Sequence, residues 1–238
     1  MNVTKDGLKN RQLYIEDYLQ MVSAEQKEYA EVFAHQRITE NNDIITDFQT
    51  DNLMEQILHK DNLNKAYKKV KSNKGAGGID GMSVEELLGY LRNNQEQLIQ
   101  KLKDGKYKPN PVRRVEIPKE TKGEFRKLGV PTVVDRVFQQ AITQVLSPIY
   151  EKQFSENSFG FRPDRGAHDA LKQCQTNVND GYVYVVDMDL EKFFDTVCQS
   201  KLIEVLSRTI KDGRVISLIH KYLNAGVISR GIFEKTEV

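Results

Sequence analysis

The chain has 238 residues, of which 39% are hydrophobic and 29% charged, and its formal net charge is +1. This is the composition of an ordinary globular protein, and no apolar run approaches the ~18 residues needed to span a membrane. Two cysteines, Cys174 and Cys198, are too few for a disulfide framework and suit a reducing compartment. The polar first nine residues predict no secretory signal. We therefore expect a cytoplasmic protein with no membrane partner.

The near-zero net charge hides an uneven distribution. Residues 101–150 hold 11 basic and 5 acidic residues, whereas residues 1–50 and 151–200 each hold 5 basic and 9 acidic residues. A polyanion can lie along the basic stretch while carboxylates gather in the next one. On charge alone, a solvated surface is the simpler interpretation.

In chain order, apolar residues three or four positions apart predict helices within the first fifty residues. A further helix is expected over residues 53–70, and it must end at the glycine-rich stretch 75–78, because glycine disfavours helix. Ser83 and Glu86 have the spacing of a capping box and predict the start of the next helix.

Residues 112–118 alternate as a strand does, and residues 125–130 can return as its antiparallel partner. The clearest helix follows Pro131 and carries one broad apolar stripe that ends at Ile149. Shorter helices are predicted near Arg165, over 202–206 and over 215–223. The class is α+β, with helices outnumbering strands.

The most informative segment is residues 182–188, a run of β-forming residues that leads into two carboxylates. Asp187 and Asp189 are two positions apart, so a strand would place them on one face. Phosphoryl-transfer enzymes with two metal ions need anchored carboxylates of this kind. An alternative that the pattern leaves open is that Asp189 caps the next helix and that Phe193 and Phe194 are core residues.

Four blocks in order resemble the group II intron reverse transcriptases. They lie within residues 74–81, 117–141, 158–171 and 189–195, the last being an acid and an aliphatic residue followed shortly by Phe-Phe-Asp. Four blocks over roughly residues 53–206 are specific where one would be weak. The resemblance implies the fingers of a right-hand polymerase with an N-terminal helical extension and the start of the palm sheet.

The resemblance also implies a division of the chain. It assigns residues 1–52 to an N-terminal helical segment and residues 53–104 to an extension with a template-facing loop. Residues 105–180 are then the fingers, and residues 181–238 the first part of the palm.

Five residues match positions of known role in the resembling family. Asp189 matches the acid that binds catalytic Mg²⁺, and the main-chain carbonyl of Leu190 helps it. Phe194 matches the aromatic residue that lies under the incoming sugar. Lys119 and Arg126 match the cations that hold the triphosphate of the incoming nucleotide.

A second set of residues is expected to contact RNA. The glycine loop lacks a Gly-Lys-Ser/Thr ending, so it is no nucleotide-hydrolysis motif, and the resemblance places it against the template. The basic residues beside the proline-rich turn at 109–111 are candidates for phosphate contacts, although they can also be merely exposed. Arg162 can equally be the buried partner of an acid. The full RNA-binding set is Lys74, Gly75, Gly77, Gly78, Lys106, Lys108, Arg113, Arg114 and Arg162.

The chain departs from the family at three places, one of which is residues 196–199, where the family often has Asn-His after Phe-Phe-Asp. Lys127 stands where a proline usually follows the arginine. The chain also ends before the aromatic-X-Asp-Asp hairpin that supplies the other metal carboxylates, so we expect the fragment to be inactive alone.

The predicted function is that of an RNA-directed DNA polymerase that also binds intron RNA as a splicing maturase. Its partners would be intron RNA, an RNA template with a DNA primer, and deoxynucleoside triphosphates. Three alternatives stay open: a non-catalytic maturase scaffold, a domesticated or CRISPR-associated reverse transcriptase, and a homodimer formed through the acidic N-terminal helices.

Overall fold

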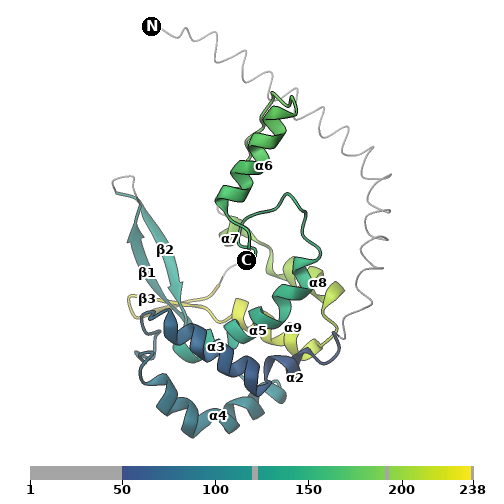
Figure 1. Cartoon of the computed structure of the whole chain (residues 1–238). Coiled ribbons are helices and arrows are strands. Elements are labelled where there is room, and N and C mark those ends of the chain that lie inside the picture. The colour runs from purple at the N-terminus through teal and green to yellow at the C-terminus, as the bar shows by residue number, and fades with distance from the viewer. Residues whose placement is uncertain (1–49, 120–122, 191–192, 237–238) are drawn as a thin grey trace. The chain divides into compact units, whose positions relative to one another are not determined.

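The computed structural model describes residues 50–119, 123–190 and 193–236, all within one compact unit, Gln49–Val238 (Figure 1). The helices predicted for the first fifty residues fall outside this part of the chain, except for residue 50. Among the helices described, none has the length and apolar character to cross a membrane.

The helix predicted over 53–70 is in fact two helices, α2 (Leu53–Ile57) and α3 (Lys60–Ser72). In one continuous helix the Ile57 carbonyl would accept from the backbone N–H of Asp61. Here the side-chain amide of Asn62 donates to that carbonyl at 2.9 Å, and the Asp61 N–H turns to the His59 ring. The same Asn62 amide reaches the Ala141 carbonyl at 3.0 Å, so the break is fixed by a tertiary contact.

The capping box predicted at Ser83 is present. The Ser83 N–H donates to a Glu86 carboxylate oxygen at 2.7 Å, and the Glu86 N–H donates to the Ser83 hydroxyl at 3.3 Å. A turn occupies the next residues, and the regular helix α4 runs over Leu87–Lys103.

The predicted hairpin forms one side of a four-stranded sheet of order β2-β1-β3-β4. Strands β1 (Val112–Pro118) and β2 (Phe125–Val130) are antiparallel over six residue pairs, from Arg113 opposite Val130 to Pro118 opposite Phe125. β3 (Val227–Ser229) joins β1 in parallel, and β4 (Ile232–Glu234) returns antiparallel to β3.

Helix α5 (Val133–Glu151) is the centre of the core, as its apolar stripe predicts. It packs against α2 and α3, and α2 also meets α9 (Gly213–Leu223), which packs on α8 (Gln199–Thr209). The buried apolar residues of α5 are Val133, Val134, Val137, Phe138, Ala141, Ile142 and Ile149.

The buried carboxylate of Asp212 connects α2, near the start of the described residues, with the start of α9. Asp212 caps α9 and accepts from the Met54 N–H at 2.9 Å. Arg214 donates to Asp212 and, through both terminal nitrogens at 2.7 Å, to Glu55 on α2. Burial alone would raise the pKa of Asp212, but the hydrogen bonds from Arg214 and Met54 outweigh it and lower the pKa.

The strand predicted over 182–188 is wrong. Residues 182–190 have no regular structure, and their side chains are exposed throughout. β-forming residues become a strand only when a neighbour pairs with their backbone and packs on their face, and no described strand does so here. Helix α6 (Ala167–Asn179) precedes this stretch and the short α7 (Phe193–Thr196) follows it.

Candidate nucleotide and nucleic-acid site

The β1–β2 hairpin places the two predicted triphosphate cations on one face. Ile117 lies opposite Arg126, and the Lys119 N–H continues the ladder by donating to the Glu124 carbonyl at 2.9 Å. Because alternate residues of a strand share a face, Lys119, Ile117 and Arg126 point to the same side. The structure therefore brings together two cations whose pairing the sequence alone only implied.

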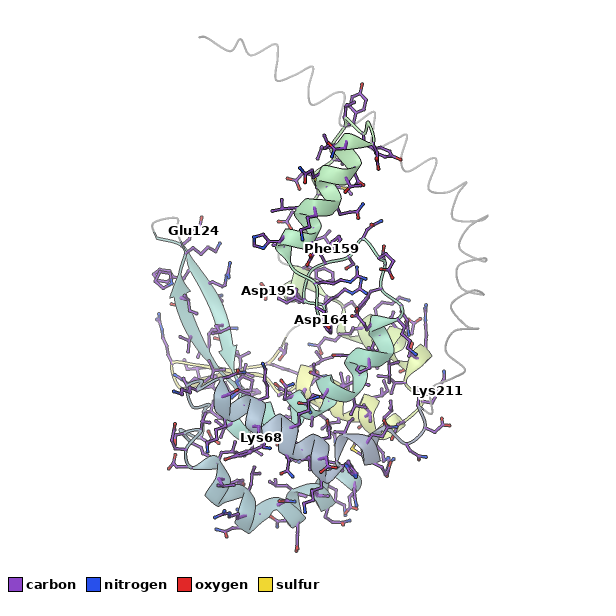
Figure 2. All side chains as sticks on the ribbon, in the orientation of Figure 1. Lys68, Glu124, Phe159, Asp164, Asp195 and Lys211 are labelled. Carbon is purple, nitrogen blue, oxygen red and sulfur yellow. The ribbon has the colours of Figure 1, made fainter. Side chains whose placement is uncertain are left out.

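The two cations differ in what holds them. The Lys119 ammonium pairs with Glu124, which Figure 2 labels near the far end of the hairpin, at 2.9 Å with both side chains about half exposed. Such a pair is weak and readily exchanged. Arg126 makes no ion pair or hydrogen bond through its side chain within the described residues. An anion at this face would thus meet one free guanidinium and one ammonium held by a single weak contact.

Asp189, the predicted metal ligand, lies in the irregular stretch before α7. One of its carboxylate oxygens accepts from the Leu190 N–H at 2.9 Å, and its side chain is exposed. No hydrogen bond or ion pair among the described residues joins it to Lys119 or Arg126. Asp187 is exposed as well.

The donor set around Asp189 does not fit a complete Mg²⁺ site. Mg²⁺ demands six oxygen ligands in near-octahedral geometry, and two-metal sites need several carboxylates. Over residues 50–119, 123–190 and 193–236, no group of three His, Cys, Asp or Glu residues lies close enough to hold a metal ion. Asp189 and the Leu190 carbonyl supply three oxygens at most, fewer than the six that Mg²⁺ requires.

Phe194 lines a cavity with a volume of about 760 Å³. Its ring is 87% exposed and meets Phe193 edge to face, with centroids 5.6 Å apart. Arg114 lines the same cavity and pairs with Glu234 on β4, and Tyr222 of α9 forms another part of the wall. The structure thus connects Phe194 with Arg114, which the sequence placed in separate sets.

The glycine loop is held down by two arginines. The Arg113 guanidinium donates twice to the Gly77 carbonyl, at 2.9 and 3.2 Å, and Arg136 donates to the Ala76 carbonyl at 2.6 Å. A Cβ at Gly78 would lie 2.6 Å from the Cα of Thr132. The glycines are therefore required by the close approach of this loop to the start of α5. Arg113 supports the loop through Nε and one terminal nitrogen, and its contact with phosphate stays a prediction.

The remaining basic candidates differ in their contacts. Lys74 has a left-handed backbone with φ of 47° at the entrance to the loop. Lys106 pairs with Asp104 at 3.4 Å, while Lys108 makes no side-chain hydrogen bond or ion pair within the described chain. Both Lys106 and Lys108 line a cavity of about 330 Å³ beside the loop.

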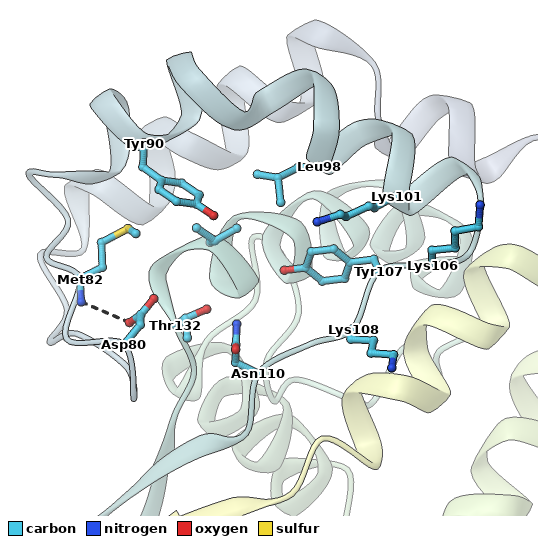
Figure 3. A pocket seen from close by; sticks show the side chains of 11 residues that line it. Asp80, Met82, Tyr90, Leu98, Lys101, Lys106, Tyr107, Lys108, Asn110 and Thr132 are labelled. Atoms are coloured by element: carbon cyan, nitrogen blue, oxygen red, sulfur yellow. Dashed lines mark hydrogen bonds between the residues drawn. The ribbon is translucent and has the colours of Figure 1, made fainter.

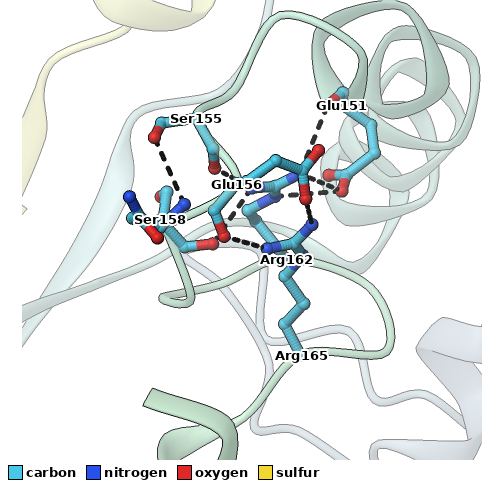
Figure 4. Close-up of polar contacts among 7 residues, drawn as sticks. Glu151, Ser155, Glu156, Ser158, Arg162 and Arg165 are labelled. Carbon is cyan, nitrogen blue, oxygen red and sulfur yellow. Dashed lines mark hydrogen bonds and ion pairs between the residues drawn. The ribbon is translucent and has the colours of Figure 1, made fainter. Parts of the chain in front are cut away.

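Arg162 has the contacts of a structural residue. The residue is 8% exposed, and its guanidinium binds one Glu151 carboxylate oxygen at 2.7 and 2.9 Å. It also donates to the carbonyls of Ser155 and Ser158, as Figure 4 shows. Arg165 donates to a Glu156 carboxylate oxygen in the same cluster. The contacts favour the alternative that Arg162 is the buried partner of an acid.

Sequence reasoning gave no role to a buried polar cluster around Asp135, which is 1% exposed. Its carboxylate accepts from the Tyr107 and Thr132 hydroxyls, both at 2.7 Å, and from the Asn110 N–H at 3.1 Å. Burial and the neighbouring Asp135 raise the pKa of Tyr107. The Thr132-x-x-Asp135 spacing is a capping signal that could have located the cluster.

Arg136, next to Asp135, is the second residue that was missed. Burial lowers the pKa of its guanidinium, and its buried Nε has no hydrogen-bond partner. It lies within α5, between the buried Val134 and Val137, and no motif in the sequence indicates its contact with the glycine loop.

The chain matches known proteins over most of its length. Residues 117–238 match the family described as reverse transcriptase (RNA-dependent DNA polymerase). The group II intron-encoded protein LtrA of Lactococcus lactis subsp. cremoris is 35% identical over 201 residues, covering 84% of this chain and 33% of LtrA. Protein YkfC of Escherichia coli (strain K12) is 36% identical over 187 residues, covering 76% of this chain and 49% of YkfC.

One solved structure, described as a partial Cas6-RT-Cas1--Cas2 complex, has a TM-score of 0.49 and 21% identity over 76% of this chain and 29% of that chain. This chain thus spans a third to a half of the length of LtrA and YkfC. The family match covers half of the residues and includes the hairpin cations, Asp189 and Phe194. The chain belongs to the reverse transcriptase family.

Proposed function

We propose that this chain is the nucleotide- and template-binding part of an RNA-directed DNA polymerase of the group II intron type, which also binds intron RNA as a splicing maturase. The relatives named above support the intron assignment, and the family match supports the polymerase chemistry. A non-catalytic scaffold would need neither Asp189 nor the paired hairpin cations.

The observation that carries the proposal is the shared face of Lys119 and Arg126 on the hairpin. Phosphoryl transfer depends on positioning and on neutralising the charge of the triphosphate. Two cations on one face of a two-stranded ladder, with the apolar side chain of Ile117 on the same face, can together bind the phosphates of a nucleotide. Their exposure leaves them accessible to a nucleotide from solution.

In the reaction the primer 3′-hydroxyl loses its proton to solvent, its oxygen bonds to the α-phosphorus of a deoxynucleotide, and the bond from that phosphorus to the bridging oxygen breaks, so that pyrophosphate leaves. Lys119 and Arg126 would hold the charged phosphates, and Phe194 would pack against the sugar and fill the space of a 2′-hydroxyl. Asp189 and the Leu190 carbonyl would contribute oxygens to Mg²⁺. The described residues do not supply that ion's other ligands.

The proposed partners are an RNA template with a DNA primer, intron RNA and deoxynucleoside triphosphates. The proposed location is the bacterial cytoplasm, which suits two free and exposed cysteines.

The test is steady-state primer extension by a polypeptide that extends this chain to the length of its relatives. The variant Lys119→Ala/Arg126→Ala should raise the KM for deoxynucleotide by about tenfold or more, because two charge-assisted contacts to phosphate are lost. The matched control is Lys201→Ala/Arg208→Ala on α8, where the same two residue types pair with exposed Glu204.

The control variant should leave the KM unchanged. An equal rise in both variants would show that only overall charge matters and would overturn the assignment of the hairpin face. A polypeptide that splices intron RNA but never extends a primer would instead favour the scaffold.

A further inference from the structure

The cavity of about 330 Å³ beside the glycine loop, which Lys106 and Lys108 line, contains polar groups that the proposed triphosphate site does not use. Its walls come from α4, from the chain that follows α4, from the loop before α4 and from the start of α5. Leu98, Tyr107 and Val134 form buried walls, with Thr132 fully buried among them. The volume falls at the lower end of the range of ligand pockets.

Four polar side chains meet in this cavity. In Figure 3 the Tyr90 hydroxyl, the Lys101 ammonium and the Asn110 amide point into one space, with the Asp80 carboxylate across from Lys101. Lys106 and Lys108 lie toward one side of the cavity, with their ammonium groups directed away from its centre.

Two of these polar groups are charged and available. One Asp80 carboxylate oxygen accepts from the Met82 N–H at 3.2 Å, and the other has no hydrogen bond or ion pair within the described residues. The Lys101 ammonium has neither kind of contact in the same part of the chain. An acceptor and a cationic donor thus face each other across apolar and aromatic walls.

We propose that this cavity binds the guanine base of an unpaired nucleotide in RNA. Guanine presents two adjacent N–H donors, N1–H and the 2-amino group, which one carboxylate can accept together. The adjoining edge carries the O6 and N7 acceptors, with O6 next to N1–H, and a lysine ammonium can donate to them. The Tyr90 ring and Leu98 offer surfaces for the faces of the base, as unstacked RNA bases require.

The same groups reject the other bases. Adenine places its unprotonated N1 where Asp80 requires a donor, and cytosine does the same with N3. Uracil has one N–H at that edge and no amino group beside it. Lys106 and Lys108 at the rim are placed for the flanking phosphates, whose contacts add affinity without reading sequence.

The inference rests on the proposed function, because RNA is the source of the guanine. A free guanine nucleotide has the same chemistry, so the two sources need separate measurements. The first arm is fluorescence anisotropy of the 238-residue chain with labelled RNA hairpins of one sequence whose loop holds a single guanine, inosine or adenine. The second arm is binding of fluorescent GMP, with AMP as its counterpart.

Two variants and one control localise the effect. Asp80→Asn keeps an oxygen for the Met82 N–H but replaces the free carboxylate oxygen by a donor, and Lys101→Met keeps the apolar stem of the side chain. Lys103→Met alters the same helix at an exposed position that does not line the cavity. Thermal melts followed by circular dichroism confirm that all three proteins are folded.

We expect the guanine loop to bind about tenfold more tightly than the adenine loop, with inosine between them. Asp80→Asn and Lys101→Met should erase this preference, and Lys103→Met should keep it. Equal affinity for the guanine and adenine loops, at any salt concentration, would overturn the guanine site while leaving RNA binding by the chain intact.

Absence of binding to all three hairpins would contradict the proposed function and exclude RNA as the source of the guanine. In that case, GMP binding that exceeds AMP binding and is lost in Asp80→Asn would support the guanine site with a free nucleotide as its ligand. Failure of GMP as well would overturn the site.

Discussion

Residues 50–151 and residues 152–196 carry similar helix and strand patterns but differ in whether their apolar side chains are buried. The first region contains α5 and the helices packed on it, and its apolar stripes are buried. In the second, Arg162 alone is buried among the described residues, although α6 and the run at 182–188 carry ordinary helix and strand patterns. A local pattern fixes what a segment can become, and a packing partner decides whether it does.

The largest expected effect on stability is at Gly78, where the backbone of the glycine loop lies closest to the start of α5. In Gly78→Ala the new Cβ would lie 2.6 to 2.9 Å from backbone atoms of Pro131 and Thr132, which cannot move aside as a side chain can. We expect a loss of about 3 kcal/mol in the free energy of unfolding, measured by urea denaturation.

The control for that variant is Gly89→Ala, within α4, where an added Cβ meets nothing within 4 Å. This change should stabilise the protein by about 0.5–1 kcal/mol through helix propensity. If Gly78→Ala were equally harmless, the glycine loop would not be pressed against α5.

The next largest effect concerns the Asp212 junction between α2 and α9. Asp212→Ala removes the α9 cap and leaves the Met54 N–H without its partner, at a cost of about 2–3 kcal/mol, because a buried donor is left unsatisfied. Thermal or urea unfolding at pH 7 measures this difference.

The same junction predicts a pH dependence. The pKa values of Asp212 and Glu55 are lower in the folded protein than their usual values of 3.8 and 4.5. The stability they contribute is therefore present above those usual values and is lost as pH falls through the folded pKa values. In Asp212→Asn the loss of stability below about pH 4 should be shallower, and an unchanged acid limb would contradict this role.

The two regions can be compared directly by making the same substitution, Val to Ala, once in each and measuring the loss of stability. Val137→Ala acts on a side chain 3% exposed in α5, and Val186→Ala on one that is 70% exposed. We expect about 2 kcal/mol of destabilisation for the first and less than about 0.5 kcal/mol for the second. Comparable losses would show that the 182–190 stretch is packed after all.

The smallest effect is expected for a single surface cation. Lys108→Ala should lower the affinity of the chain for RNA only a few fold and should reduce the slope of log affinity against log salt by about 0.7–0.9, the value for one phosphate contact. Titration by anisotropy at several salt concentrations measures the slope. An unchanged slope would mean that Lys108 is merely exposed.

Much of the fold could be predicted from the sequence because its signals are local. The Ser83–Glu86 capping box, the β1–β2 hairpin and the α5 stripe all depend on residues close together in the chain, and all three are confirmed. The break between α2 and α3 could not be predicted, because the Asn62 amide fixes it through a contact with α5. The strand predicted over 182–188 is absent for a related reason, because no strand among the described residues pairs with this stretch.

The candidate site divides in the same way. The alternation of the hairpin strands predicts that Lys119 and Arg126 share a face, and the register agrees. By contrast, the hydrogen bonds of Arg113 to the Gly77 carbonyl and of Arg162 to the Glu151 carboxylate are not indicated by any motif. The catalytic role of Asp189 and the division of the chain into fingers and palm stay predictions.

The most direct test of the central claim is primer extension on an annealed RNA template by a polypeptide that extends this chain to the length of its relatives, comparing Asp189→Ala with Asp187→Ala. We expect Asp189→Ala to abolish extension while RNA binding is kept, and Asp187→Ala, the exposed acid two residues earlier, to extend normally. Normal extension by Asp189→Ala would contradict the assignment of this carboxylate to the polymerase reaction.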